Sequence, residues 1–239
     1  MRIFKLIPAF LLPFSFSPIL GQKAKSGNPY GLQLIESIPQ YCSTLKAAPE
    51  KALVDLAKMI PGIKIELPYT QEDNFMKQPM YPPVTKTYLR KAAADALRSV
   101  SEALRLKGYR LLVYDAYRPY AVTMRFWELV KDERYVANPA NGSGHNRGLA
   151  VDLTLLYENG QPVDMGTGFD NFSDTAHHSY RNLSTEIISN RKLLKNTMEQ
   201  FGFRALDTEW WHYSWPNDKN YELLDLTFKE LEVATRKER

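Results

Sequence analysis

Reactive side chains of two kinds are scarce in this 239-residue sequence, which has one cysteine, Cys42, and four histidines. A single cysteine cannot close an intramolecular disulfide, and it cannot form a thiolate metal cage by itself. The net charge is only +4 and no long basic run concentrates it, so a nucleic-acid partner is not expected. Apolar residues make up 44% and charged residues 24%, which excludes a largely disordered chain, a collagen-like fibre and a polytopic membrane protein.

The apolar run at the N-terminus, Leu6–Leu20, is too short for a stable membrane span. It carries no charge, follows a short basic start and contains three prolines, which disfavour a spanning helix. We therefore expect a secretory signal peptide over residues 1–21 and a mature start near Gln22. The protein is then exported, periplasmic or extracellular, without stable membrane insertion. A buried N-terminal helix is the alternative.

Apolar residues along the mature chain follow both helix and strand periods. Helices are expected over residues 47–59, 88–106, 119–131 and 185–201. Buried strands are expected over residues 109–115, 148–156 and 210–215. We interpret this mixture as one α+β or α/β domain over residues 46–228. A polar linker over 22–45 precedes the domain, and a charged tail over 229–239 follows it.

The segment Ser143–Asp152, SGHNRGLAVD, places a histidine in a loop before a buried strand that carries an aspartate. Asp152 lies between Val151 and Leu153, and an unpaired carboxylate in an apolar strand costs free energy unless a metal or a cation partners it. Gly148 permits a tight backbone entry into this strand. Taken alone, the segment fits two interpretations about equally. One is a metal site, and the other is an aspartate that caps a turn near a core histidine.

A second segment, Glu209–Tyr213 (EWWHY), puts a carboxylate and an imidazole three residues apart among aromatic residues. On a regular strand such residues point to opposite faces, so Glu209 and His212 can share a cavity only if the strand begins or kinks at Glu209. With His145 and Asp152, His212 completes a set of two nitrogens and one carboxylate that suits zinc with an open fourth position. Glu209 is then free to act as general base on water there. The alternative is an aromatic core strand with a hydrogen-bonded histidine.

Arg118 follows a buried strand in the segment Tyr114–Pro119 (YDAYRP) and immediately precedes a predicted helix. A guanidinium fixed there can hold an oxyanion or a carboxylate, whereas a structural ion pair with Asp115 is the competing interpretation. The adjacent His177 and His178 have no carboxylate motif beside them, so an incidental surface pair is the favoured interpretation.

These segments, in this order along the chain, resemble the zinc D-alanyl-D-alanine dipeptidases of the VanX type, within the wider group of D-Ala-D-Ala peptidases. The resemblance spans about residues 60–228, and the double tryptophan before the last histidine is typical of the dipeptidase branch. The segments that carry it are residues 69–75, 114–119, 143–152, 165–170 and 209–213. The resemblance implies an α+β fold, with a single zinc-peptidase domain and a central, mainly antiparallel sheet flanked by helices.

The resemblance also implies a role for each matching residue. The matching positions are His145, Asp152 and His212 for the ligands of one zinc ion per chain, Glu209 for the catalytic base, Arg118 for transition-state stabilisation, Ser143 for the substrate carboxylate, and Tyr69 and Asp170 for the substrate ammonium. The implied activity is hydrolysis of D-Ala-D-Ala to two D-alanines, with a zinc-bound water activated by the base. Familiar dipeptidases of this type work in the cytoplasm, so the predicted signal peptide is a departure from them.

Two alternative functions remain open at this point. A D,D-carboxypeptidase that trims peptidoglycan stem peptides would use the same chemistry in an open cleft. A non-catalytic cell-wall-binding module would retain the fold alone, but mere binding needs neither Glu209 nor Arg118.

Overall fold

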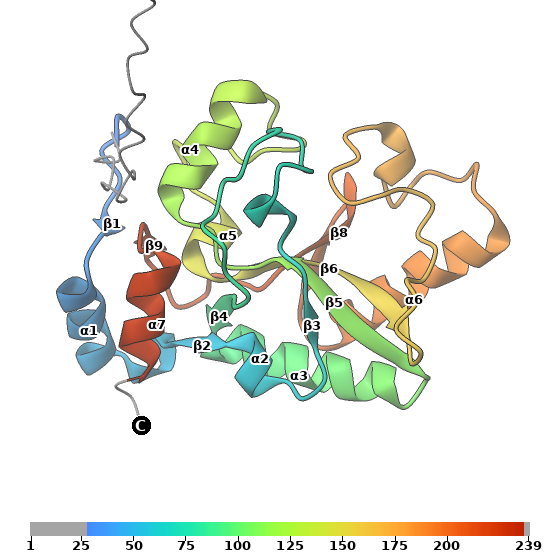
Figure 1. The fold of residues 1–239 in the computed structure, drawn as a ribbon, viewed down its shortest axis with the longest axis horizontal. Helices are drawn as coiled ribbons and strands as arrows, with labels where there is room; N and C mark the ends of the chain where they lie inside the picture. The colour runs from blue at the N-terminus through green and yellow to red at the C-terminus, as the bar shows by residue number, and fades with distance from the viewer. Residues whose placement is uncertain (1–27, 237–239) are drawn as a thin grey trace, which may run out of the picture.

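A computed structural model describes residues 28–236, and the predicted signal peptide lies outside this range. The main sheet has five strands and is mostly antiparallel, since β3 runs parallel to β5 and the other neighbours are antiparallel. In spatial order, its strands are β3 (Lys64–Ile65), β5 (Tyr109–Asp115), β6 (Ala150–Tyr157), β8 (Glu209–Ser214) and β7 (Arg204–Leu206) (Figure 1). The predicted α+β class with a mainly antiparallel central sheet is confirmed.

Helices pack on both sides of this sheet. Helix α3 buries Leu97, Val100 and Leu104 in a core that it shares with α6 and the central strands, whereas α4 lies on the opposite side (Figure 1). The α-helices of the described range are α1 (Ile38–Ala47), α2 (Leu56–Met59), α3 (Lys91–Arg105), α4 (Tyr120–Leu129), α5 (Gly144–Arg147), α6 (Thr185–Gln200) and α7 (Phe228–Arg236). Within residues 28–236, none of them combines the length and the apolar character that crossing a membrane requires.

Two small sheets join segments that are far apart in the sequence. Strand β1 (Leu34–Ile35) pairs in parallel with β9 (Leu223–Leu224), and β2 (Leu53–Asp55) pairs antiparallel with β4 (Tyr88–Arg90). The helix expected over 88–106 therefore begins only at α3, because its first residues form β4.

The segments on either side of the predicted domain contain regular structure within the described residues. Residues assigned to the linker over 22–45 form β1 and most of α1, and Tyr41 is only 1% exposed. Residues assigned to the charged tail over 229–239 extend α7, which buries Leu231 and Ala234. In both segments, apolar residues within an otherwise polar stretch pack against distant parts of the chain.

The helix expected over residues 47–59 was also wrong. The chain there forms a 3-10 turn, η1 (Pro49–Lys51), then β2, and only a single α-turn, α2. Asp55 ends the strand and caps α2, where its carboxylate accepts a hydrogen bond from the amide of Ala57 at 3.0 Å. An aspartate favours such a cap over a helix interior, and the pairing of Leu53 with Arg90 outweighs the helical spacing of the apolar residues.

Candidate active site

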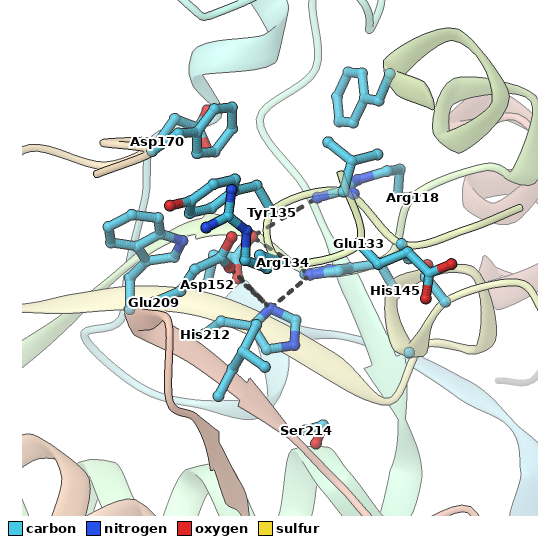
Figure 2. Close-up of a pocket in the computed structure, with 18 of the residues that line it drawn as sticks. Arg118, Glu133, Arg134, Tyr135, His145, Asp152, Asp170, Glu209, His212 and Ser214 are labelled. Atoms are coloured by element: carbon cyan, nitrogen blue, oxygen red, sulfur yellow. Dashed lines mark hydrogen bonds and ion pairs between the residues drawn. The ribbon is translucent and has the colours of Figure 1, made fainter. Parts of the chain in front are cut away.

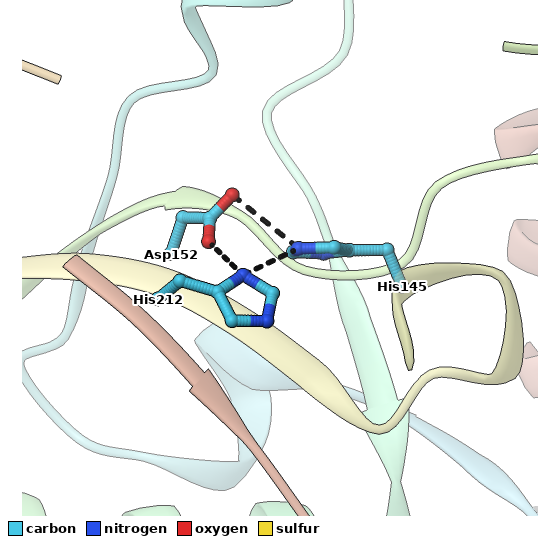
Figure 3. A group of neighbouring side chains, drawn as sticks. All are labelled: His145, Asp152 and His212. Carbon is cyan, nitrogen blue, oxygen red and sulfur yellow. Dashed lines mark hydrogen bonds and ion pairs between the residues drawn. The ribbon is translucent and has the colours of Figure 1, made fainter. Parts of the chain in front are cut away.

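Three side chains with metal-ligand chemistry converge beside the sheet. Asp152 of β6 lies opposite His212 of β8 in the strand register, and His145 reaches them from α5, just before β6. Nδ1 of His212 lies 2.8 Å from Oδ1 of Asp152, and Nε2 of His145 lies 3.4 Å from Oδ2 of the same carboxylate. The two ring nitrogens are 3.3 Å apart (Figure 3). The structure thus brings the predicted triad together, with its ligand atoms within 4.8 Å of one another.

The orientation of His145 is fixed by its second ring nitrogen. Nδ1 lies 2.7 Å from the carbonyl oxygen of Ala116, so it donates its proton there and Nε2 presents a lone pair to the triad. Helix α5 begins with a capping box, in which Ser143 and Asn146 each bond the other's backbone amide at 3.1 and 3.0 Å. It ends at Gly148, with a φ of 69°, where a Cβ would lie 2.5 Å from a leucine side chain. The predicted tight entry into the strand is confirmed.

The electrostatics of the triad suit a bound cation. Burial lowers the pKa of His212 and keeps its imidazole neutral, which is the form that binds metals. Burial raises the pKa of Asp152, but His145 and His212 outweigh burial and hold that pKa below its usual range. Two imidazole nitrogens and one ionised carboxylate therefore form a metal-binding triad.

Glu209 lies beside the triad because β8 begins irregularly. It is the first residue of β8, and the register between β7 and β8 shifts between Ala205 and Leu206. Because the strand begins at Glu209, this residue and His212 can share a cavity, as the sequence pattern required. Oε2 of Glu209 lies 4.0 Å from Nδ1 of His212 (Figure 2). Glu209 is 5% exposed, and burial, with the nearby carboxylates, raises the pKa of its carboxyl well above the usual range. A carboxyl in this setting can take up a proton and return it.

Arg118 lines the cavity and also forms the ion pair considered from the sequence. Its Nη2 and Nε lie 2.7 and 2.9 Å from Oδ2 of the fully buried Asp115. The same Nη2 lies 3.7 Å from Oδ2 of Asp152, and the guanidinium lies 4.7 Å from the ring centre of Phe126. A structural ion pair with Asp115 and a role in binding an oxyanion are therefore compatible, because the ion pair fixes the guanidinium at the edge of the metal triad.

Arg118 and His145 are tied to one another by contacts that the sequence does not reveal. Oδ1 of Asp115 accepts hydrogen bonds from the hydroxyl of Tyr81 at 2.9 Å and from the amide of Ala116 at 3.0 Å. The carbonyl of Ala116 in turn holds the ring of His145. One buried carboxylate thereby fixes both an arginine and a metal-ligand histidine. No local pattern signals this, since Tyr81 lies in a proline-rich loop 34 residues before Asp115.

The residues that the resemblance assigns to the substrate lie on the walls of the same cavity. The hydroxyl of Tyr69 donates to Oδ2 of Asp170 at 2.9 Å. Desolvation and the nearby Asp152 raise the pKa of Asp170 to about 8, so the carboxyl is mostly neutral near pH 7, and a cation bound beside it would stabilise its ionised form. Ser143 accepts a bond from the amide of Asn146 through its hydroxyl oxygen and keeps a proton to donate. Figure 2 shows Asp170 on a separate part of the wall from His212.

The cavity itself has a volume of about 340 Å³. Every site residue predicted from the sequence lines it. Aromatic side chains also belong to the lining, among them Phe172 and Tyr135, whose ring centres are 5.0 Å apart. His177 lies outside this lining, with Nε2 3.8 Å from Asp174. The predicted site residues therefore share one cavity, and neither His177 nor His178 lines it.

Comparison with known proteins adds an independent observation. A protein-family profile described as D-ala-D-ala dipeptidase matches residues 49–234. A D-alanyl-D-alanine dipeptidase of Escherichia coli is 38% identical over 172 residues, 72% of this chain and 89% of the relative. One from Enterococcus faecalis is 32% identical over 185 residues, 69% of this chain and 91% of the relative. A solved structure of the LD-carboxypeptidase LdcB covers 77% of each chain at 23% identity, with a TM-score of 0.38. With its metal-binding triad and a family match over most of its length, this chain belongs to the D-Ala-D-Ala dipeptidase family and is a metallopeptidase.

Proposed function

We propose that this chain hydrolyses the free dipeptide D-alanyl-D-alanine to two D-alanines. The observation that carries the proposal is a single cavity in which Glu209 and Arg118 flank a metal-binding triad. Peptide hydrolysis needs a base for the attacking water and donors for the developing oxyanion, and these residue types supply both. Membership of the family, and relatives that carry this name, support the choice of substrate.

The donor set favours zinc, one ion per chain, held by His145, Asp152 and His212. Two neutral imidazoles and one carboxylate are a ligand set of catalytic zinc sites, which keep a further position open. The inward-facing Nε2 of His145, fixed through the carbonyl of Ala116, supports this assignment. Zinc bound by such ligands supplies a Lewis acid and lowers the pKa of water to about 7.

Glu209 is assigned as the general base and acid. Its carboxylate accepts a proton from the attacking water and delivers that proton to the amine that leaves. Arg118 donates hydrogen bonds to the oxyanion that develops on the scissile carbonyl. Because Asp115 already fixes the guanidinium, little reorganisation is needed when the charge forms.

Each end of the dipeptide is assigned a partner on the cavity wall. Asp170 and Tyr69 are assigned to the ammonium, since a cation beside Asp170 would stabilise its ionised form and Tyr69 donates a hydrogen bond to the same carboxyl. Ser143 donates its hydroxyl proton to the substrate carboxylate. A cavity of about 340 Å³ is at the small end for ligand pockets, which suits a dipeptide better than a stem peptide.

Product analysis is the decisive experiment. Zinc-loaded protein is incubated with D-Ala-D-Ala and, separately, with a stem pentapeptide, and the released D-alanine is measured. Hydrolysis of the dipeptide alone is expected. Release of the terminal D-alanine from the pentapeptide would favour a D,D-carboxypeptidase, and binding without any hydrolysis would favour a cell-wall-binding module.

We also propose that the chain is exported to the periplasm or the cell exterior. The support is the charge-free apolar segment Leu6–Leu20 after a basic start, which lies outside the described residues. Protein purified from its native host should begin near Gln22. N-terminal sequencing that finds Met1 on most of the protein would contradict this proposal.

A further inference from the structure

Helix α6 contributes one of the buried arginines of the described range, Arg191. The buried arginines of the described range are Arg90, Arg118 and Arg191. Arg90 and Arg118 each face a carboxylate, that of Glu222 at 3.6 Å and that of Asp115 at 2.7 Å. Arg191 is 5% exposed and donates to three backbone carbonyls. Arg90 also bonds three backbone carbonyls, but those belong to Lys51, Arg147 and Glu222, which lie far apart in the sequence. Burying a charge is costly, so the bonds that stabilise the Arg191 guanidinium must be strong.

All three carbonyls belong to one loop, residues 165–177. Nε of Arg191 donates to Met165 at 2.7 Å, Nη2 donates to Thr175 at 2.9 Å and Nη1 donates to His177 at 3.2 Å. One planar guanidinium therefore ties the beginning of this loop to its end. The loop follows β6 and lies above α6 in Figure 1.

The middle of the same loop carries Asp170. Apart from the 3-10 turn η3 (Asp174–Ala176), residues 165–177 have turns and irregular backbone. Asp170 has a φ of 57°, a left-handed conformation that costs a non-glycine residue on the order of 1 kcal/mol. Its surroundings must therefore hold it, and the loop's regular structure is too slight to do so. A bond of 2.8 Å from Trp210 Nε1 to the hydroxyl of Thr167 gives the loop a second side-chain anchor.

We propose that Arg191 is a positioning residue for substrate recognition. By fixing both ends of loop 165–177, it holds Asp170 where that carboxylate meets the substrate ammonium. This inference rests on the role that the proposed function gives to Asp170. Arg191 is absent from the cavity lining, whereas Asp170 belongs to it, so Arg191 acts through the loop backbone.

The fork of the guanidinium makes arginine the residue that can do this. A lysine at position 191 keeps the charge and most of the stem, but one compact ammonium cannot reproduce three donors in a fixed plane. Arg191→Lys should therefore raise KM for D-Ala-D-Ala about tenfold, below the roughly hundredfold that a displacement of about 1 Å can cost. Since the catalytic groups are untouched, kcat should stay within about twofold.

The experiment compares four proteins, namely the wild type, Arg191→Lys, Asp170→Ala and the double variant. Each is assayed for kcat and KM with D-Ala-D-Ala and with N-acetyl-D-Ala-D-Ala, which has no ammonium. Zinc content and Tm are measured on the same samples. Lys192→Arg is the matched control, because it exchanges the same two cationic side chains at the next, exposed position of α6. Arg191→Gln is a second variant for the case in which Arg191→Lys does not fold.

The expected pattern is specific to positioning. Arg191→Lys should raise KM for the dipeptide and leave KM for the acetylated substrate unchanged. In the Asp170→Ala background, Arg191→Lys should cause no further increase in KM for the dipeptide. Additive effects on KM, or a lower Tm with unchanged KM, would overturn the role of Arg191. An unchanged KM in Asp170→Ala would instead overturn the assignment of Asp170, and the inference with it. Zinc content should be equal in all variants.

Discussion

The two halves of the candidate active site are held by different parts of the fold. Asp152 and His212 form a cross-strand pair in the main sheet, and His145 sits in a capped helical turn directly before β6. Tyr69 and Asp170 lie in a 3-10 turn and in loop 165–177, and they meet through a side-chain bond of 2.9 Å.

From this difference we infer that backbone pairing places the metal chemistry, whereas side-chain bonds between loops place substrate recognition. A strand register changes only in whole residues, so the positions of Asp152 and His212 tolerate small disturbances nearby. A loop can shift by a fraction of an ångström. We call His145, Asp152, His212 and Glu209 the metal half of the site, and Tyr69 and Asp170 the loop half. Substitutions in the metal half should therefore remove metal or turnover, and substitutions in the loop half should change KM and selectivity more than kcat.

Removal of a metal ligand should have the largest effect on activity, because it disrupts the metal half of the site. His212→Ala should lose most of the bound zinc and nearly all hydrolysis, because one of three ligands is gone. His177→Ala should keep its zinc, since His177 lies outside the triad. Elemental analysis after dialysis, with dipeptide assays on the same samples, measures both. Full zinc retention in His212→Ala would contradict the ligand assignment.

Glu209→Gln should separate chemistry from metal binding within that half. The amide cannot accept a proton, so kcat should fall by about 10²–10⁴-fold, while zinc content stays at the wild-type value. Glu128→Gln is the control, since it makes the same chemical change at an exposed position of α4. Near-normal turnover in Glu209→Gln would reduce Glu209 to a structural role.

The same contrast separates what the sequence could predict from what it could not. Strand β5 matches its predicted limits, and the triad was predictable because each ligand lies in or beside a strand with a clear apolar pattern. The position of Glu209 followed from the period of a strand. Local patterns carried this information because neighbouring strands pair in a restricted set of ways.

Contacts between loops and distant elements carried no such local signal. Arg191 stands beside Lys192 on a helix with many polar residues, and nothing nearby ties it to the carbonyls that it binds. The bond between Tyr81 and Asp115 was hidden for the same reason. The helix predicted over residues 47–59 failed because apolar spacing there serves pairing between β2 and β4, and tertiary contacts outweigh helix propensity.

Asp170→Ala, in the loop half, should have the smallest effect, and it concerns selectivity. N-acetyl-D-Ala-D-Ala offers an amide where Asp170 would meet an ammonium, and an unpaired carboxylate in a partly buried site costs about 1–3 kcal/mol. The kcat/KM of the wild type should therefore be roughly 10–100-fold lower for the acetylated form than for the dipeptide. Asp170→Ala should lower kcat/KM for the dipeptide and narrow this gap, whereas Asp174→Ala, with an 80% exposed side chain on the same loop, should leave it unchanged. Assays of both substrates in one buffer measure the gap. If the wild type hydrolyses D-Ala-D-Ala and its N-acetyl form equally well, the loop half does not recognise the substrate ammonium, and the roles given to Asp170 and Tyr69 are wrong.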